Sequence, residues 1–227
     1  MSKGIFLAGT GTDVGKTYMA GLLVKKLHES SRRAGYFKAA MSGNSRRPDG
    51  SLIPGDALAV QRVSGIPQSL ESMSPYVYET AVSPHLASQL EGNPVRLDVV
   101  ERAYAAAAQA YDYVTVEGSG GILCPLRHDG ERLFLEDVIR ALHLPCLLVA
   151  DAGLGTINSV VLTAFYMHEK QIPLRGILFN RFHPGDVMEE DNLRMCEELT
   201  GVPVLACCRE GSLDLDMDAG ALAALYA

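Results

Sequence analysis

The sequence predicts an α/β fold with a doubly wound, mostly parallel sheet and helices on both faces. Two observations support this prediction: short apolar runs alternate with amphipathic stretches along the whole chain, and a glycine-rich loop joins the first run to the first stretch. Continuous apolar runs are typical of strands that are buried on both faces, as in parallel sheets. The 227 residues are 48% hydrophobic and 21% charged and contain no linker-like segment, so we expect residues 1–227 to form a single domain.

The expected strands are short apolar runs, and the expected helices have apolar residues three or four positions apart. Strands are predicted at 5–8, 36–39, 113–116, 146–149, 176–179 and 202–206. The first helix is marked by an apolar stripe from Met19 to Leu27, and Gly35 follows it as a stop signal. Further helices are predicted from near Asp56, over 84–91, 97–111, 134–142, 156–170 and 188–200, and a loop is predicted over 42–55.

Composition narrows the classes of function. The formal net charge of −7 argues against nucleic acid as a partner, because phosphate backbones favour clustered Lys and Arg. No run approaches the ~20 apolar residues that span a bilayer, and the N-terminus lacks the layout of a signal peptide. The five cysteines show no metal-ligand spacing, and their odd number and scatter favour a reducing, cytoplasmic setting.

The strongest motif is Gly-Thr-Gly-Thr-Asp-Val-Gly-Lys-Thr over residues 9–17, between the first strand and the first helix. That context is the one a phosphate-binding P-loop requires, so the fold is expected to be of the P-loop NTPase type. Backbone N–H groups and the helix N-terminus suit triphosphate oxygens, Lys16 adds a positive charge, and the Thr17 hydroxyl is placed for Mg²⁺. The usual pattern has its first glycine at position 10, where Thr10 stands, so the loop is a variant.

Three further polar residues lie where a doubly wound sheet concentrates its function, at strand carboxyl ends and the loops that follow. Lys38 ends the second strand, and Glu117 ends an apolar run before Gly-Ser-Gly-Gly. A carboxylate in Glu117's position commonly holds the metal of a nucleotide. The alternatives are that Lys38 is a surface lysine, that Glu117 is a solvated glutamate at a strand end, and that Asp56 is an ordinary helix cap. As strand-end and loop residues, Lys38 and Lys16 are expected to contribute little to folding stability.

An ordered set of motifs resembles the dethiobiotin synthetase family over nearly the whole chain. The matching stretches are residues 9–17, Lys38 with Ser42-Gly43, Asp56-Ala57, Ser83-Pro84-His85, 116–121, 153–158 and Asn180. The variant spacing of the phosphate loop is itself a feature of that family.

The resemblance implies a reaction in which ATP, CO₂ and 7,8-diaminononanoate give dethiobiotin, ADP and phosphate, a step of biotin synthesis. One amine captures CO₂ as a carbamate, ATP phosphorylates the carbamate, and the other amine attacks this mixed anhydride to close the ring. Mg²⁺ is the implied cofactor and ATP the co-substrate. The family works as a cytoplasmic homodimer whose sites are shared across the interface.

The resemblance also assigns residues to roles. Lys16 and Lys38 are implied to be catalytic, and Thr17, Asp56 and Glu117 to hold the metal. The implied nucleotide-binding residues are Asp13, Val14, Gly15, Lys16, Thr17, Tyr18, Asp56, Glu117, Gly118, Ser119, Gly120, Asn180, Arg181, Arg209, Glu210 and Gly211. The implied substrate-binding residues are Thr12, Lys38, Ser42, Gly155, Thr156, Ile157 and Asn158, the last four acting on the partner's substrate. A helix-cap role for Asn180, and an ordinary helix start in a monomer for 155–158, are the alternatives.

The chain departs from the family pattern at two places, and two other classes of protein remain as alternatives to this family. Ala39 stands where the family usually has Pro, and 207–211 lacks the usual Ile-Pro after the last strand. A nucleotide-switched partner ATPase, of the chromosome-partitioning or nitrogenase iron-protein type, would carry a lysine where Gly11 stands. An amidotransferase-type ligase would need a glutaminase domain, for which 227 residues leave no room.

Overall fold

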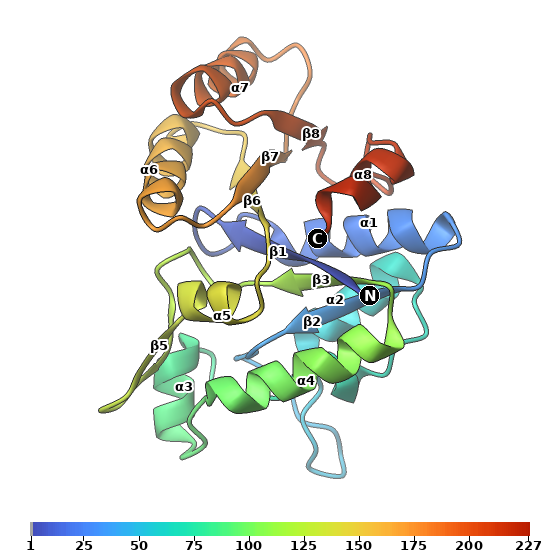
Figure 1. Cartoon of the computed structure of the whole chain (residues 1–227), viewed down its shortest axis with the longest axis vertical. Coiled ribbons are helices and arrows are strands. Elements are labelled where there is room, and N and C mark those ends of the chain that lie inside the picture. Colours follow the sequence, from blue (N-terminus) through green and yellow to red (C-terminus); the bar gives the residue numbers. More distant parts are fainter. Residues whose placement is uncertain (1) are drawn as a thin grey trace.

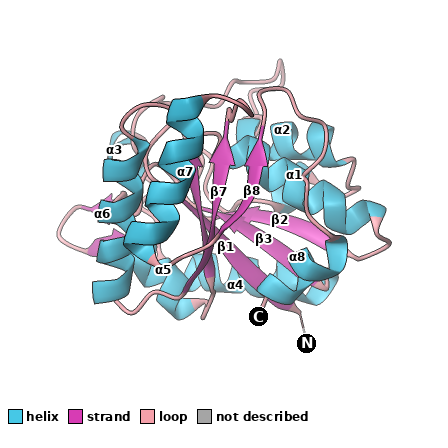
Figure 2. Ribbon diagram, turned by 90° about the horizontal axis from the view of Figure 1, so that it is seen from above, coloured by secondary structure: helices cyan, strands magenta, loops and turns pink. Residues whose placement is uncertain are grey.

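A six-stranded parallel sheet runs through the middle of the molecule (Figures 1 and 2), in a computed structural model that describes residues 2–227. The strand order is β2-β3-β1-β6-β7-β8, and every neighbouring pair is parallel. The strands are β1 (Lys3–Gly9), β2 (Ala34–Lys38), β3 (Tyr113–Glu117), β6 (Cys146–Asp151), β7 (Leu174–Asn180) and β8 (Val204–Cys208). All six predicted strands are therefore confirmed, and no strand end is shifted by more than two residues.

Alternate residues of each central strand point into two separate cores. In β1, Phe6 and Ala8 belong to one core, whereas Ile5 and Leu7 belong to the other. Successive side chains of a strand point to opposite faces, so a strand covered on both sides needs apolar residues at every position. This is the physical reason why the strands appear in the sequence as unbroken apolar runs.

The helices form one layer on each face of the sheet (Figure 2). One layer contains α1 (Lys16–Glu29), α2 (Gly55–Ser64) and α8 (Ala219–Leu225). The other contains α4 (Leu97–Ala110), α5 (Leu135–Ala141), α6 (Thr156–Glu169) and α7 (Val187–Thr200). The short helices α3 (Pro84–Leu90) and η1 (Leu70–Ser72) lie in the connections. The predicted helices are confirmed, including the beginning of α3 at Pro84.

The order in which the chain adds strands to the sheet changes direction at β1. From β1 it moves outward to β2, returns through β3 beside β1, and then continues on the other side through β6, β7 and β8. In sheets of this type ligands bind at the carboxyl ends of the strands where this reversal occurs. The loops after β1, β2 and β3 meet at that edge.

Two elements lie outside the sequence prediction. Strands β4 (Pro125–His128) and β5 (Arg132–Phe134) form an antiparallel hairpin, in which Leu126 and Leu133 are buried. Its strands are only four and three residues long, so its apolar signal is weak. Helix α8 begins at a cap formed by Asp218, whose carboxylate accepts hydrogen bonds from two backbone N–H groups. Tyr226 then buries its ring and shares a 2.7 Å hydrogen bond with Thr115 of β3.

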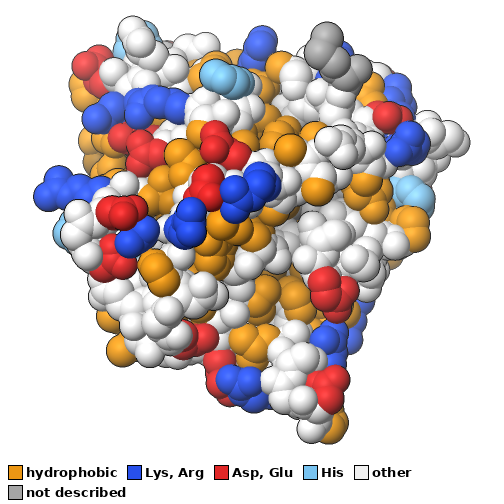
Figure 3. Space-filling view, turned by 60° about the horizontal axis from the view of Figure 1, so that its bottom comes forward, with side chains coloured by type: hydrophobic (Ala, Val, Ile, Leu, Met, Phe, Trp, Pro, Cys, Tyr) orange, Lys and Arg blue, Asp and Glu red, His pale blue; other side chains and the backbone are white. Residues whose placement is uncertain are grey.

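The surface carries basic and acidic side chains close together, as the face in Figure 3 shows. Exposed pairs include Arg46 with Glu79 and Arg194 with Asp191. All five cysteines are free thiols. No helix within residues 2–227 combines the length and the apolar character that crossing a bilayer requires.

Candidate functional site

The phosphate loop between β1 and α1 presents unpaired backbone donors. Asp13 and Gly15 adopt left-handed backbone conformations, with φ of 61° and 93°. No side chain caps the N-terminus of α1, so its first N–H groups remain available for an anion. At Gly15 a Cβ atom would collide with the amide of Asn180, which explains the glycine at that position.

The early glycine of the variant loop has a steric explanation. The Lys16 side chain folds back over the loop, and its Nζ donates a 2.7 Å hydrogen bond to the carbonyl of Gly11. A Cβ atom at Gly9 would lie 2.8 Å from Cδ of Lys16, which is too close for a normal contact. Gly9 therefore makes room for the lysine that faces the bound phosphates in P-loops.

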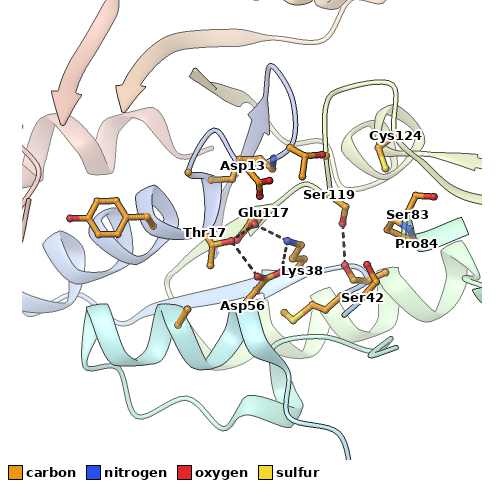
Figure 4. Close-up of a pocket in the computed structure, with 18 of the residues that line it drawn as sticks. Asp13, Thr17, Lys38, Ser42, Asp56, Ser83, Pro84, Glu117, Ser119 and Cys124 are labelled. Atoms are coloured by element: carbon orange, nitrogen blue, oxygen red, sulfur yellow. Dashed lines mark hydrogen bonds and ion pairs between the residues drawn. The ribbon is translucent and has the colours of Figure 1, made fainter. Parts of the chain in front are cut away.

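Four side chains from four different elements meet beside this loop (Figure 4). Nζ of Lys38 lies 2.6 Å from Oδ2 of Asp56 and 2.7 Å from Oε1 of Glu117. The Thr17 hydroxyl donates to the same Glu117 oxygen at 2.8 Å and lies 3.4 Å from Oδ1 of Asp56. Because β2 and β3 pair in a register that places Lys38 opposite Glu117, the sheet itself brings this ion pair together.

Burial and charge set the pKa values of this cluster. Lys16 and Lys38 are each 7% exposed and Glu117 is 2% exposed, so neither lysine is a surface residue. Burial acts to lower the pKa of Lys38, but the carboxylates of Glu117 and Asp56 outweigh it and raise the pKa above the ordinary lysine value. Burial lowers the pKa of Lys16, and the more distant Glu117 does not fully offset it. Burial and Glu117 together raise the pKa of Tyr36, which keeps its hydroxyl protonated.

Two residues that the sequence analysis did not single out hold the cluster in place. The Asn44 side chain accepts a 2.8 Å hydrogen bond from the N–H of Gly55, the first residue of α2, and so anchors the turn that carries Asp56. The hydroxyl of Tyr36 donates to Oε2 of Glu117 at 2.7 Å. Asn44 stands in a polar loop and Tyr36 in an apolar strand, so neither had a distinguishing signal in the sequence.

A cavity of about 970 Å³ contains this cluster and continues beyond it. At the far end the Ser42 hydroxyl donates a 2.6 Å hydrogen bond to the carbonyl of Val82, next to Ser83 and Pro84. Thirteen predicted site residues line this one cavity: Thr12, Asp13, Gly15, Lys16, Thr17, Tyr18, Lys38, Ser42, Asp56, Glu117, Ser119, Gly120 and Arg181. Cys124 also lines it, and the sequence analysis assigned no role to that thiol.

The other predicted residues do not line the cavity. Val14 and Gly118 are buried behind it, and the amide of Asn180 donates to the carbonyl of Val14 at 3.2 Å. Arg209, Glu210 and Gly211 are exposed after β8, and Gly155, Thr156, Ile157 and Asn158 lie at the start of α6. Arg181 links the end of β6 to the phosphate loop, because its guanidinium pairs with Asp151 and donates to the carbonyl of Asp13.

The oxygen atoms of Thr17, Asp56 and Glu117 fit a hard divalent cation. They converge without nitrogen or sulfur ligands, and Asp56 and Glu117 already share one cation, the ammonium of Lys38. Across residues 2–227 no group of three or more His, Cys, Asp and Glu side chains is placed to hold a metal. A small set of oxygen donors suits Mg²⁺, which usually retains water and phosphate ligands instead of an all-protein cage.

Comparison with known proteins places the chain in a family. A family model described as an AAA domain matches residues 3–210. The ATP-dependent dethiobiotin synthetase BioD of Brachyspira hyodysenteriae is 45% identical over 217 residues, which cover 95% of this chain and 96% of that protein. The protein of the same name from Clostridium botulinum strain Loch Maree is 41% identical over 212 residues, 93% of each chain.

Solved structures show the same fold at low identity. A ParA family ATPase from Chlorobium tepidum superposes with a TM-score of 0.54 at 15% identity, covering 91% of this chain and 83% of that one. The MinC:MinD complex of Aquifex aeolicus contains a chain with a TM-score of 0.57 at 11% identity, covering 92% and 82%. These likenesses concern the fold alone, a P-loop NTPase-type α/β sheet. The identities of 41% and 45% over nearly full length go further, and the chain belongs to the family of ATP-dependent dethiobiotin synthetases.

Proposed function

We propose that this chain converts 7,8-diaminononanoate, CO₂ and ATP into dethiobiotin, ADP and phosphate. The observation that carries the proposal is the cluster of Lys38, Asp56, Glu117 and Thr17, which lies beside the phosphate loop in a cavity that extends to Ser42. That arrangement joins a triphosphate site to a second polar site within one continuous cavity. A reaction between ATP and a small second substrate needs such a space.

The chemistry requires cations more than a protein nucleophile. A carbamate and a triphosphate brought together concentrate negative charge, and fixed positive groups stabilise the transferring phosphoryl. Lys16, whose Nζ now donates to the Gly11 carbonyl, would turn to the β- and γ-phosphates. Lys38 would lie between the carbamate and the phosphoryl group. The second amine would then attack the carbamic-phosphoric anhydride and release phosphate.

Mg²⁺ is part of the same proposal, with Thr17, Asp56 and Glu117 as the residues that would hold it. When bound, the ion neutralises phosphate charge and orients the leaving group. The three residues would be placed for this role because Thr17 lies in the first turn of α1, Asp56 lies in the first turn of α2, and Glu117 ends β3.

The amine end of the substrate would lie near Ser42 and Thr12. The Ser42 hydroxyl donates its one hydrogen to the carbonyl of Val82, so its oxygen can act as an acceptor at this end of the cavity. Such an acceptor suits a diamine, and the hydroxyl would turn away from Val82 to donate to the carbamate.

The test is ADP release by the purified protein with ATP, Mg²⁺ and bicarbonate, with and without diaminononanoate. We expect release that depends on the diamine, together with the formation of dethiobiotin. ADP release that is independent of the diamine, with no dethiobiotin, would reject the proposal and favour a nucleotide-switched ATPase.

A homodimer with shared sites is a further part of the proposal. Leu154, Leu162 and Phe165 lie in or just before α6 and are 91%, 60% and 63% exposed. An apolar helix face of this kind suits an interface between copies. Thr156 supports a ligand role for the start of α6, since its buried hydroxyl has no hydrogen-bond partner within the described chain. The segment 155–158 would then hold the tail carboxylate of the partner's substrate.

A cytoplasmic location accords with the five free thiols.

Mixing two impaired variants tests the shared site. Asn158→Asp should repel the substrate carboxylate and raise KM for the diamine, whereas Lys16→Gln should slow phosphoryl transfer about 100- to 1000-fold. In a mixed dimer one site collects both defects and the other is intact, so random exchange should restore about one quarter of wild-type activity at low diamine. Demonstrated exchange without recovery would contradict the shared site.

A further inference from the structure

The two oxygens of the Glu117 carboxylate have different partners. Oε1 accepts hydrogen bonds from the Thr17 hydroxyl at 2.8 Å and from the Lys38 ammonium at 2.7 Å. Oε2 accepts from the hydroxyl of Tyr36 at 2.7 Å. Both Tyr36 and Glu117 are buried, with exposed fractions of 0% and 2%. The carboxylate is therefore held by one oxygen and presents the other to the cluster.

The backbone of Tyr36 is fixed in a way that is unusual for an edge strand. Strand β2 is at the edge of the sheet, so one side of it has no neighbouring strand. The buried side chain of Gln68 takes that place: its Oε1 accepts from the N–H of Tyr36 at 2.8 Å, and its Nε2 donates to the carbonyl of Tyr36 at 3.0 Å. Gln61 in turn donates to the backbone carbonyl of Gln68 at 2.8 Å. The backbone of Tyr36 is thus anchored opposite Thr115, and from there the tyrosine hydroxyl reaches Glu117 at the end of β3.

A carboxylate without the tyrosine hydroxyl would have a competing arrangement. Glu117 would be free to rotate and to offer both oxygens to the Lys38 ammonium, which already lies at 2.7 Å. Such a two-oxygen ion pair would keep the carboxylate on the lysine and away from a metal ion. Groups that orient a metal ligand typically change metal affinity or activity 10- to 100-fold when they are removed.

We propose that Tyr36 is a positioning residue, which holds Oε2 of Glu117 so that Oε1 remains directed at Thr17 and is available to the divalent cation. The inference rests on the proposed function, because it takes Glu117 as a residue that holds Mg²⁺. It adds a determinant of metal affinity that does not itself touch the metal or the substrate.

The test compares Tyr36→Phe with Tyr226→Phe. Both variants remove one buried hydroxyl on the same side of the sheet, but the Tyr226 hydroxyl bonds Thr115 and not Glu117. Binding of Mn²⁺ is followed by electron paramagnetic resonance in the presence of a non-hydrolysable ATP analogue. We expect Tyr36→Phe to bind Mn²⁺ about 10- to 100-fold more weakly than wild type, and Tyr226→Phe to match wild type. Affinity for the analogue in excess chelator should be unchanged in both variants.

Two further variants keep the result decisive. Gln68→Met leaves the tyrosine hydroxyl in place but releases its backbone, and should weaken Mn²⁺ binding in the same direction. In a Glu117→Gln background, Tyr36→Phe should have no additional effect. If wild type binds Mn²⁺ and Tyr36→Phe binds it equally well or more tightly, the positioning role is wrong while the proposed function stands. If wild type itself binds no Mn²⁺ with the analogue, the metal role of Glu117 fails, and the inference fails with it.

Discussion

The two halves of the sheet place very different groups at their carboxyl ends. At the ends of β2 and β3, Lys38 and Glu117 are 7% and 2% exposed and are linked to Asp56 and Thr17. At the ends of β6 and β7, Asp151 pairs with Arg181, and these side chains are 39% and 40% exposed. Beyond β8, residues 209–211 are exposed. Similar parallel strands thus end in a buried charge cluster on one side and in a solvated pair on the other.

The difference shows how burial determines what a charge can do. A buried ion needs partners of opposite charge. Removing one partner leaves the other buried without a counter-charge, which lowers the free energy of unfolding by roughly 3–5 kcal/mol. An exposed pair is screened by water, and its contribution is roughly 0–1 kcal/mol. We therefore expect the β2–β3 half to control phosphoryl transfer and stability together, and the β6–β7 half to tune nucleotide affinity weakly.

The largest effect is expected for Lys38→Gln. It removes a positive charge proposed to face the transferring phosphoryl, so kcat should fall about 100- to 1000-fold. It also leaves Glu117 buried without its cation, so the free energy of unfolding should fall by about 3 kcal/mol. Steady-state kinetics and urea denaturation measure the two effects.

Lys16→Gln is the control within the same half of the sheet. It should lose kcat to a similar extent, but its unfolding free energy should be unchanged or raised, because burial penalises the charged form of Lys16. Equal destabilisation by the two variants would contradict the distinction between Lys38, which pairs with two carboxylates, and Lys16, which donates to a backbone carbonyl.

The second effect concerns alkaline pH. The pKa of Lys16 lies below the ordinary value of 10.5, so ATP affinity should fall as pH rises through that lowered value. The folded-state pKa of Lys38 lies above 10.5, so its contribution to stability is complete below 10.5 and is lost as pH rises through the raised value. Competitive acetylation read by mass spectrometry should therefore label Lys16 at lower pH than Lys38, and ATP should protect Lys16.

A smaller effect is expected for Arg181→Gln. Its pair with Asp151 is more than a third exposed, so the free energy of unfolding should change by less than about 1 kcal/mol. The hydrogen bond that Arg181 donates to the Asp13 carbonyl supports the phosphate loop. In the variant, KM for ATP should therefore rise a few-fold while kcat stays unchanged. A loss of kcat as large as that of Lys38→Gln would contradict the expected difference between the two halves of the sheet.

The smallest effect is expected when the base of the nucleotide is changed. Residues 207–211 lack the family's usual pattern, and 209–211 are exposed. Phosphate and metal contacts do not depend on the base, so CTP or GTP should support measurable synthesis. A preference for ATP of a thousandfold or more in kcat/KM, about 4 kcal/mol, would show a selective base site.

Much of the fold was predictable because its signals are local. Short, mainly apolar runs marked all six parallel strands, and a glycine-rich stretch between a strand and a helix marked the phosphate loop. The hairpin β4–β5 escaped prediction because its strands are only four and three residues long and bury only two leucines deeply. The expectation that Lys38 contributes little to stability is contradicted by its burial between two carboxylates.

By itself the sequence determined which chemical groups stand at the strand ends, because a strand and its following loop are contiguous in the chain. Only the tertiary structure decided which of these groups meet. Lys38 faces Glu117 because β2 pairs with β3, and Tyr36 reaches the same carboxylate although 81 positions separate the two residues. Asn44 anchors α2 through a backbone N–H that no sequence pattern identifies. Residue periodicity reports which face of an element is buried, whereas hydrogen bonds between elements depend on strand order and register, which are set by packing of the whole sheet.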